Sequence, residues 1–257
     1  MTFMIYCRKH KRRNTMAKFK RIGRNALFTL SAVVLLCACS QEDAEQETLV
    51  ALGDSITYGA NLEDSGQSAY PHLIGEDAGF EVQNLAVSGW QTAQVMEALR
   101  GDQEYRQRVQ DADVIAMTIG SNDLLEILRL AETNGADNPG QVEVILRQEL
   151  GNSVVFDEIG ELIEEIQSLT DAQILLYNIY NPFSPGNSMH QIGEALLPEV
   201  NATFREVTES YENVHLVDAY SAYNGKQEDY IIPGDIHPTE EGQAVLAEIG
   251  LEAIKND

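Results

Sequence analysis

Short apolar runs alternate along most of the chain with longer segments whose apolar residues have helical spacing. Five runs rich in apolar and β-branched residues are predicted to be strands: Thr48 to Leu52, Glu81 to Val87, Asp113 to Ile119, Gln173 to Ile179 and Val214 to Val217. The second, third and fourth runs are nearly continuously apolar, which is typical of strands covered on both faces in a parallel sheet.

Helical patterns separate these runs. Apolar residues recur every three or four positions from Val155 to Leu169 and from Ile192 to Tyr211, so both segments are predicted to be helices with one apolar face. After Pro238, Thr239 is predicted to cap a last helix, whose first turn holds Glu240 and Glu241. Acidic residues are favoured there by the helix dipole.

The alternation of strands and helices predicts an α/β fold. We expect a three-layer α/β/α sandwich with a five-stranded parallel sheet in the order 2-1-3-4-5, joined by right-handed crossovers. The longest connection, Leu124 to Thr170, is mostly helical but is interrupted from Asn134 to Gly140 by turn-forming residues. We interpret this interruption as a surface excursion, either a lid or the wall of a pocket.

The N-terminal pattern is different and indicates export. A basic segment from Arg8 to Arg24 precedes a largely apolar run from Ala26 to Ala38, in the order typical of a signal peptide. This run is shorter than the roughly 20 residues that cross a bilayer. The residues Leu36-Cys37-Ala38-Cys39 are similar to the bacterial lipoprotein signal, in which Cys39 becomes lipid-modified after cleavage. Secretion without a lipid and an uncleaved anchor are the alternatives.

This interpretation divides the chain into three parts: a lipoprotein-type signal peptide at 1–38, an acidic tether at 39–47 and one domain at 48–257. Translation can start at Met1 or at Met16. Cleavage removes Cys7 and Cys37, and acylation occupies Cys39, so the domain is expected to fold without a disulfide. The expected location is the outer side of the cell membrane.

Charge is very unevenly distributed. Residues 1–39 contain nine of the 17 Lys and Arg residues, whereas all 41 Asp and Glu residues follow them. So acidic a surface repels phosphate backbones, which argues against nucleic acid as a partner. The expected exported part contains only two lysines, Lys226 and Lys255. This acid-rich, lysine-poor composition favours adaptation to high salt or alkaline surroundings, where counterions screen the repulsion between acidic residues. The alternative is that the acidic residues serve only ordinary solubility. The sequence leaves the oligomeric state open.

Four residues that could take part in catalysis lie next to predicted strand ends. Ser55 follows the first strand, Gly89 the second and Asn122 the third, while His237 precedes the last helix. Open α/β sheets bind ligands at the carboxyl ends of their strands, so these residues are expected to meet in one crevice. A hydroxyl nucleophile, a base and hydrogen-bond donors for an oxyanion are the groups that acyl transfer needs.

The sequence around these four residues resembles the SGNH or GDSL hydrolases. The resemblance rests on four blocks: Gly53-Asp54-Ser55-Ile56-Thr57-Tyr58-Gly59, Asn84-Leu85-Ala86-Val87-Ser88-Gly89, Gly120-Ser121-Asn122-Asp123 and Asp235-Ile236-His237-Pro238. It implies a flavodoxin-like sandwich and ester hydrolysis through an acyl-enzyme on Ser55, with His237 as the base. It also implies an oxyanion hole formed by the backbone N–H groups of Ser55 and Gly89 and the side-chain amide of Asn122.

One position departs from the family pattern. The family usually has an Asp three residues before the His, where this chain has Gly234; Asp235 is only two residues before His237. Either Asp235 or a backbone carbonyl near Gly234 is therefore expected to orient the imidazole. The other histidines, His72, His190 and His215, match no block and are expected to be structural.

The expected substrate is a lipid-like or small acyl ester, with the segment Asn181 to Pro185, Trp90 and Tyr58 as candidate pocket residues. No metal and no cofactor are expected, because neither metal-ligand spacing nor a phosphate-binding Gly-rich loop is present in the sequence. A carbohydrate O-acetyl esterase is the alternative within the same class, and a non-catalytic ligand-binding lipoprotein is the alternative outside it. An apolar tunnel would favour acyl chains, and a groove of aromatic and polar groups would favour sugars.

Overall fold

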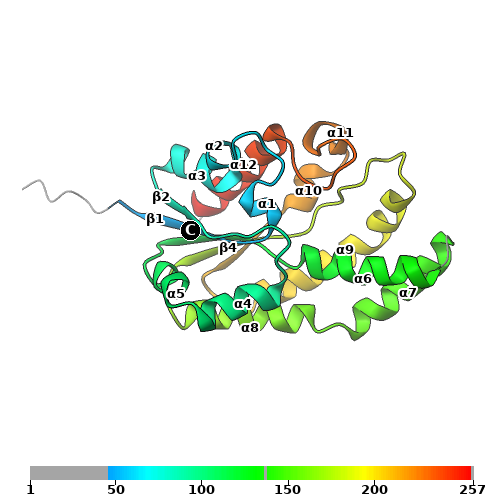
Figure 1. The fold of residues 1–257 in the computed structure, drawn as a ribbon, viewed down its shortest axis with the longest axis horizontal. Helices are drawn as coiled ribbons and strands as arrows, with labels where there is room; N and C mark the ends of the chain where they lie inside the picture. Colours follow the sequence, from blue (N-terminus) through cyan, green and yellow to red (C-terminus); the bar gives the residue numbers. More distant parts are fainter. Residues whose placement is uncertain (1–45, 136–137, 256–257) are drawn as a thin grey trace, which may run out of the picture. The chain divides into compact units, whose positions relative to one another are not determined.

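The computed structural model describes residues 46–135 and 138–255. The predicted signal peptide, the predicted lipidation site Cys39 and most of the predicted tether lie outside the described residues. Five parallel strands form one sheet in the order β2-β1-β3-β4-β5, which confirms the predicted order (Figure 1). The strands are β1 (Thr48–Gly53), β2 (Glu81–Asn84), β3 (Val114–Thr118), β4 (Gln173–Tyr177) and β5 (Val214–Val217).

Helices cover both faces of the sheet, as the sandwich prediction requires (Figure 1). Val50 and Leu52 of β1 point to a core shared with four helices: α4 (Thr92–Gly101), α5 (Gln103–Gln110), α8 (Val155–Gln167) and α9 (Ser188–Thr208). Leu49 and Ala51 point to the opposite core, shared with α3 (Tyr70–Ala78), α10 (Ala219–Tyr223) and α12 (Glu240–Lys255). Side chains alternate between the two faces because a strand has a period of two.

A helical hairpin extends from the first of these faces. It consists of α6 (Ser121–Gly135) and α7 (Pro139–Asn152), which pack with the N-terminal half of α9 around a third, smaller apolar cluster. The predicted interruption from Asn134 to Gly140 coincides with the joint between α6 and α7. Three short helices complete the described fold: α1 (Ser55–Tyr58), α2 (Ser65–Ser68) and α11 (Gln227–Tyr230).

The predicted boundaries differ from the structure mainly at β2 and α9. The strand predicted from Glu81 to Val87 ends at Asn84, and its partly exposed residues contradict the prediction of cover on both faces, because β2 lies at the sheet edge. Helix α9 begins at Ser188, before the predicted Ile192, because Asn187 Oδ1 accepts a hydrogen bond from Met189 N at 2.9 Å. The predicted cap of α12 is confirmed, since Gly242 N donates to Thr239 Oγ1 at 3.1 Å.

Candidate active site

Ser55 is the first residue of α1, at the carboxyl end of β1, which lies between β2 and β3 in the sheet. Gly53 has a φ of +115°, and a Cβ atom there would lie 1.9 Å from the carbonyl oxygen of Thr118, so only glycine allows this approach of β1 to β3. Asp54 caps the short helix by accepting a hydrogen bond from Ile56 N at 2.9 Å. These contacts place the Ser55 side chain at the edge where the parallel strands end.

Ser55, His237 and Asp235 form a hydrogen-bonded row at this edge. The Ser55 Oγ lies 2.9 Å from His237 Nε2, and His237 Nδ1 lies 2.6 Å from Asp235 Oδ1. An imidazole that donates its Nδ1–H to the carboxylate has an unprotonated Nε2, which can accept the serine proton. The geometry therefore matches that of a nucleophile, a general base and an orienting carboxylate.

A tight turn explains how Asp235 reaches the imidazole from two residues away. Asp235 N donates to Ile232 O at 2.9 Å, and the central residues of the turn are Pro233 and Gly234. Gly234 has a φ of +79°, as the third residue of a type II turn requires. Of the two alternatives from the sequence, the structure has the Asp235 carboxylate, and not a carbonyl near Gly234, against Nδ1.

The surroundings of Asp235 favour its ionised form. Desolvation raises the pKa of this carboxyl, but hydrogen bonds from Ile236 N, His237 and Asn61 outweigh it and lower the pKa below its ordinary value. Asn61 Nδ2 donates to Asp235 Oδ2 at 2.6 Å. Asn61 has a φ of +66°, a left-handed conformation that asparagine adopts more readily than most residues. No motif marked Asn61 as a site residue, and its position in a turn after the first block is the only signal.

Tyr180 is a second contributor that the sequence did not reveal. Its hydroxyl donates to the carbonyl oxygen of Ile236 at 2.8 Å, and its ring stacks on Tyr223 with a centroid distance of 4.5 Å. Burial raises the pKa of the Tyr180 hydroxyl well above its ordinary value, so the hydroxyl stays a hydrogen-bond donor. The backbone next to His237 is thereby attached to the buried core.

The predicted oxyanion residues Gly89 and Asn122 line one polar hollow, together with Gln91, Glu126, Arg129, Leu130 and Thr133. Gly89 has a φ of +84°, and no atom lies within 4 Å of the place where its Cβ would be. Asn122 Nδ2 donates to Trp90 O at 2.8 Å, which holds the turn that contains Gly89. Because an amide nitrogen carries two hydrogens, the second is left for a bound oxygen.

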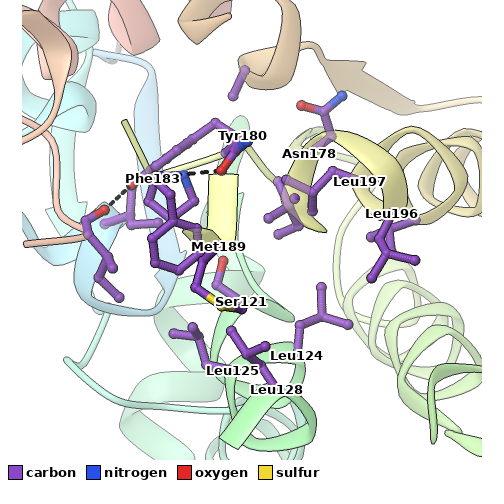
Figure 2. A pocket seen from close by; sticks show the side chains of 18 of the residues that line it. Ser121, Leu124, Leu125, Leu128, Asn178, Tyr180, Phe183, Met189, Leu196 and Leu197 are labelled. Carbon is purple, nitrogen blue, oxygen red and sulfur yellow. Dashed lines mark hydrogen bonds between the residues drawn. The ribbon is translucent and has the colours of Figure 1, made fainter. Parts of the chain in front are cut away.

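An apolar cavity of about 120 Å³ lies beside the segments that carry the Ser55–His237–Asp235 row, although these three residues do not line it themselves; Figure 2 shows part of its wall. Ile56 and Ile236, the sequence neighbours of Ser55 and His237, line it. Its walls come from α6, α7, α9 and the loop after β4: Leu124, Leu125, Leu128, Leu146, Leu150, Phe183, Met189, Leu196 and Leu197. The described residues that line the cavity include no charged side chain. Helices α6 and α7 therefore form part of the pocket wall, whereas the described lining includes no residue of the predicted excursion from Asn134 to Gly140, so its expected role as a lid or a wall stays a prediction.

The predicted pocket residues are only partly correct. Asn181 and Pro182 of the expected segment line the cavity, but Tyr58 is exposed, and Trp90 packs against the core with its ring 6.2 Å from that of Tyr105. His190 has a structural contact, since its Nδ1 lies 2.7 Å from Phe183 O and links α9 to the cavity loop.

Searches of residues 46–135 and 138–255 for other kinds of site gave two negative results. No group of three or more His, Cys, Asp or Glu side chains in these ranges is arranged to hold a metal ion. No helix in the same part of the chain combines the length and the hydropathy of a membrane span.

Known proteins share this sequence pattern and fold. Residues 51–245 match the model of the GDSL-like Lipase/Acylhydrolase family. The chain is 28% identical over 205 residues to the spore germination lipase LipC of Bacillus licheniformis, a match that covers 77% of this chain and 92% of that lipase.

Two solved structures have a similar fold at lower sequence identity. Phospholipase A1 from Streptomyces albidoflavus superimposes with a TM-score of 0.66 at 16% identity, covering 81% of this chain and 99% of the phospholipase. A catalytic mutant of an acetylxylan esterase from Geobacillus stearothermophilus gives a TM-score of 0.58 at 18% identity, with 81% and 94% coverage. Both similarities concern the fold alone.

Proposed function

The chain belongs to the GDSL-like lipase/acylhydrolase family of ester-hydrolysing enzymes, and from this premise we propose that it cleaves carboxylic esters through an acyl-enzyme on Ser55. The observation that carries the proposal is the Ser55–His237–Asp235 row, with contacts of 2.9 Å and 2.6 Å. His237 Nε2 takes the Oγ proton as Oγ attacks the carbonyl carbon, and Asp235 stabilises the imidazolium that forms.

The remaining steps use the predicted oxyanion residues and, again, His237. The backbone N–H groups of Ser55 and Gly89 and the Asn122 amide donate to the oxyanion of the tetrahedral intermediate. His237 then protonates the leaving alcohol, and the acyl group stays bonded to Oγ. Water, deprotonated by His237, attacks the acyl-enzyme; the carboxylic acid leaves, and the proton returns to Ser55.

The proposed substrate is a lipid-like ester, because the cavity next to Ser55 is lined almost entirely by leucine and other apolar side chains. An acyl chain gains free energy by leaving water for such a surface, about 0.8 kcal/mol for each buried methylene. The polar hollow with Gln91, Glu126 and Arg129 is proposed to receive the alcohol part of the ester. That same hollow keeps a carbohydrate O-acetyl esterase as the second candidate.

Two measurements test this function. A fluorophosphonate probe is expected to label the wild-type protein and not Ser55→Ala, because the probe phosphonylates an activated serine. Absence of label on folded wild-type protein in neutral and in mildly alkaline buffer would contradict the hydrolase mechanism. With p-nitrophenyl esters from acetyl to palmitoyl, kcat/KM is expected to increase with chain length; a maximum at acetyl would favour the carbohydrate esterase.

We further propose that the protein is exported and anchored to the outer face of the cell membrane through a lipid on Cys39. The basic segment Arg8 to Arg24, the apolar run Ala26 to Ala38 and the residues Leu36-Cys37-Ala38-Cys39 support this proposal. Metabolic labelling with a fatty-acid analogue is expected to label the wild-type protein in a bacterial host, and Cys39→Ser is expected to abolish the label and release the protein from membranes. Equal labelling of both proteins would refute the anchor.

A further inference from the structure

Asp54 is a fully buried carboxylate next to Ser55 that has no part in the proposed chemical steps. Its Oδ1 accepts hydrogen bonds from Ile56 N at 2.9 Å and from Thr118 Oγ1 at 2.8 Å. Its backbone N–H donates to the Thr118 carbonyl at 3.1 Å. One side chain thus connects the first turn of α1, which begins at Ser55, with the last residue of β3.

The β3 end of this connection leads to the second half of the site. Thr118 is followed after two residues by α6, whose first residues are Ser121 and Asn122. The second carboxylate oxygen of Asp54, Oδ2, is buried and accepts no hydrogen bond from the described residues, so Thr118 is the link from this carboxylate to the segment that leads into α6. Asp54 therefore joins the turn that carries the proposed nucleophile to the strand end from which the chain continues into the turn of the proposed oxyanion donor.

A chain of hydroxyl groups ends on Asp54. Thr57 Oγ1 lies 2.7 Å from Thr118 Oγ1 and 2.9 Å from the Tyr70 hydroxyl. A hydroxyl has one proton, and Thr118 gives its proton to Asp54, so Thr57 must donate to Thr118 and Tyr70 must donate to Thr57. An ionised Asp54 fixes the direction of all three hydrogen bonds.

The environment makes the charge of Asp54 sensitive to pH. Desolvation raises its pKa to about 6, against the lowering effect of the hydrogen bonds from Ile56 and Thr118 and of the nearby His237. Burial first, and to a lesser extent the charge of Asp54, raises the pKa of the nearby hydroxyls of Tyr70 and Tyr180, so both stay protonated beside this carboxylate. In mildly acidic solution Asp54 takes up a proton and ceases to be a purely accepting group.

We propose that Asp54 is a positioning residue, which in its ionised form holds the turn of Ser55 and the turn of Asn122 at the spacing that acyl transfer needs. The inference rests on the proposed function, because that function assigns the nucleophile to Ser55 and an oxyanion donor to Asn122. The proposal makes the ionisation of Asp54 a second ionisation that controls how the activity falls at low pH. Hydrolysis then requires an ionised Asp54 in addition to the free base of the mechanism, so protonation of Asp54 is a further step that stops the reaction as the pH falls.

The test is the pH dependence of kcat/KM for a p-nitrophenyl ester, measured on wild type and Asp54→Asn. Asparagine keeps an oxygen that accepts from Ile56 and Thr118, so the variant removes the charge and preserves the contacts. The acid limb of the wild type is expected to fall with a limiting slope of two in a logarithmic plot, and that of Asp54→Asn with a slope of one. Equal slopes in the two proteins would overturn the proposal.

A second variant measures the positioning itself. Asp54→Ala removes the acceptor, and kcat is expected to fall roughly a hundredfold with KM nearly unchanged, since the reacting groups lose their alignment. A folded Asp54→Ala protein with wild-type kcat would also overturn the proposal. If Asp54→Ala does not fold, the slope of Asp54→Asn decides.

The matched control is Asp102→Asn. Asp102 caps α5 by accepting from Glu104 N at 2.9 Å and Tyr105 N at 3.1 Å, so it has the same local role as Asp54 but makes no contact with the site residues. In Asp102→Asn, the acid limb of the logarithmic kcat/KM profile is expected to keep the wild-type slope. A reduced slope would show that the loss of a helix cap alone causes the effect and would overturn the proposal. Wild-type protein without esterase activity would instead refute the proposed function.

Discussion

The Ser55–His237–Asp235 row and the apolar cavity beside it are stabilised by different forces. The row depends on short polar contacts from residues far apart in the sequence, each with a defined partner. The cavity wall is an assembly of leucine side chains on α6, α7 and α9, whose contacts have no preferred direction. A substitution in the row therefore removes an atom that takes part in a specific hydrogen bond. A substitution in the cavity wall changes the volume of the cavity.

This difference predicts two kinds of mutational effect. Substitutions in the row should lower kcat for every ester, because the chemistry is the same for all of them. Substitutions in the wall should reorder esters of different chain length.

Loss of the nucleophile or the base should have the largest effect. Ser55→Ala and His237→Ala are each expected to lower kcat roughly 10⁴-fold or more, measured with a short and a long p-nitrophenyl ester. Ser88→Ala, in an exposed serine of the second sequence block, is the control and should retain wild-type activity. Substantial turnover by Ser55→Ala would assign the chemistry to another residue.

Asp235→Asn should have the next largest effect. The amide can present an N–H to His237 Nδ1 and so favour the wrong tautomer, and kcat is expected to fall roughly 10²- to 10⁴-fold. The comparison with His237→Ala, in the same assay, separates a triad from a dyad. Nearly full activity of Asp235→Asn beside an inactive His237→Ala would mean that the 2.6 Å contact is not needed for turnover.

Asn122→Ala should lower kcat by about a hundredfold with little change in KM, because the lost hydrogen bond forms with the oxyanion and not with the bound ester. Steady-state kinetics with one ester measure both constants. Gln91→Ala is the matched control, since it removes an amide from the same hollow, where Gln91 Nε2 donates to Glu126 at 2.7 Å. Equal losses in the two variants would argue against an oxyanion role for Asn122.

A change in the cavity wall should have the smallest effect and the most selective one. Leu146→Phe fills space in the cavity, and kcat/KM for the palmitoyl ester is expected to fall roughly tenfold relative to the acetyl ester. Val144→Phe adds an aromatic ring on the same helix, at a side chain that is 60% exposed, and should leave the ratio unchanged. A parallel loss for both esters in Leu146→Phe would contradict the separation between row and wall.

The sequence predicted those parts of the fold and site that local patterns determine. Strands β3 and β4 were found because a buried strand is continuously apolar, and β2 was extended too far because Leu85 and Val87 continue the same pattern at the sheet edge. Ser55 and His237 were found because each lies in a recognisable block. Trp90 was named as a pocket candidate beside the alternative of core packing, which the structure has, because the sequence pattern of a large aromatic residue is the same in a core and in a pocket.

Other features depend on three-dimensional geometry that no local pattern encodes. The contact of Asp235 with His237 depends on the left-handed φ of Gly234, which a motif with shifted spacing does not specify. The contact between Asn61 and Asp235 joins residues 174 positions apart. The leucines of α6 have the spacing of any amphipathic helix, so their role in a cavity became visible only from the packing of α7 and α9.

The separate apolar cluster of α6, α7 and α9 has a consequence for local dynamics. Its buried residues are Ala131, Val142, Leu146, Ile192 and Leu196, and they do not belong to either core of the sheet. Local unfolding needs less free energy where few buried contacts are lost, so amide hydrogens of α7 should exchange faster than those of β3. Local opening of the hairpin would then let acyl chains of different length, from the proposed lipid-like esters, enter the cavity. The amide hydrogens of the strands that position Ser55 would remain protected from exchange.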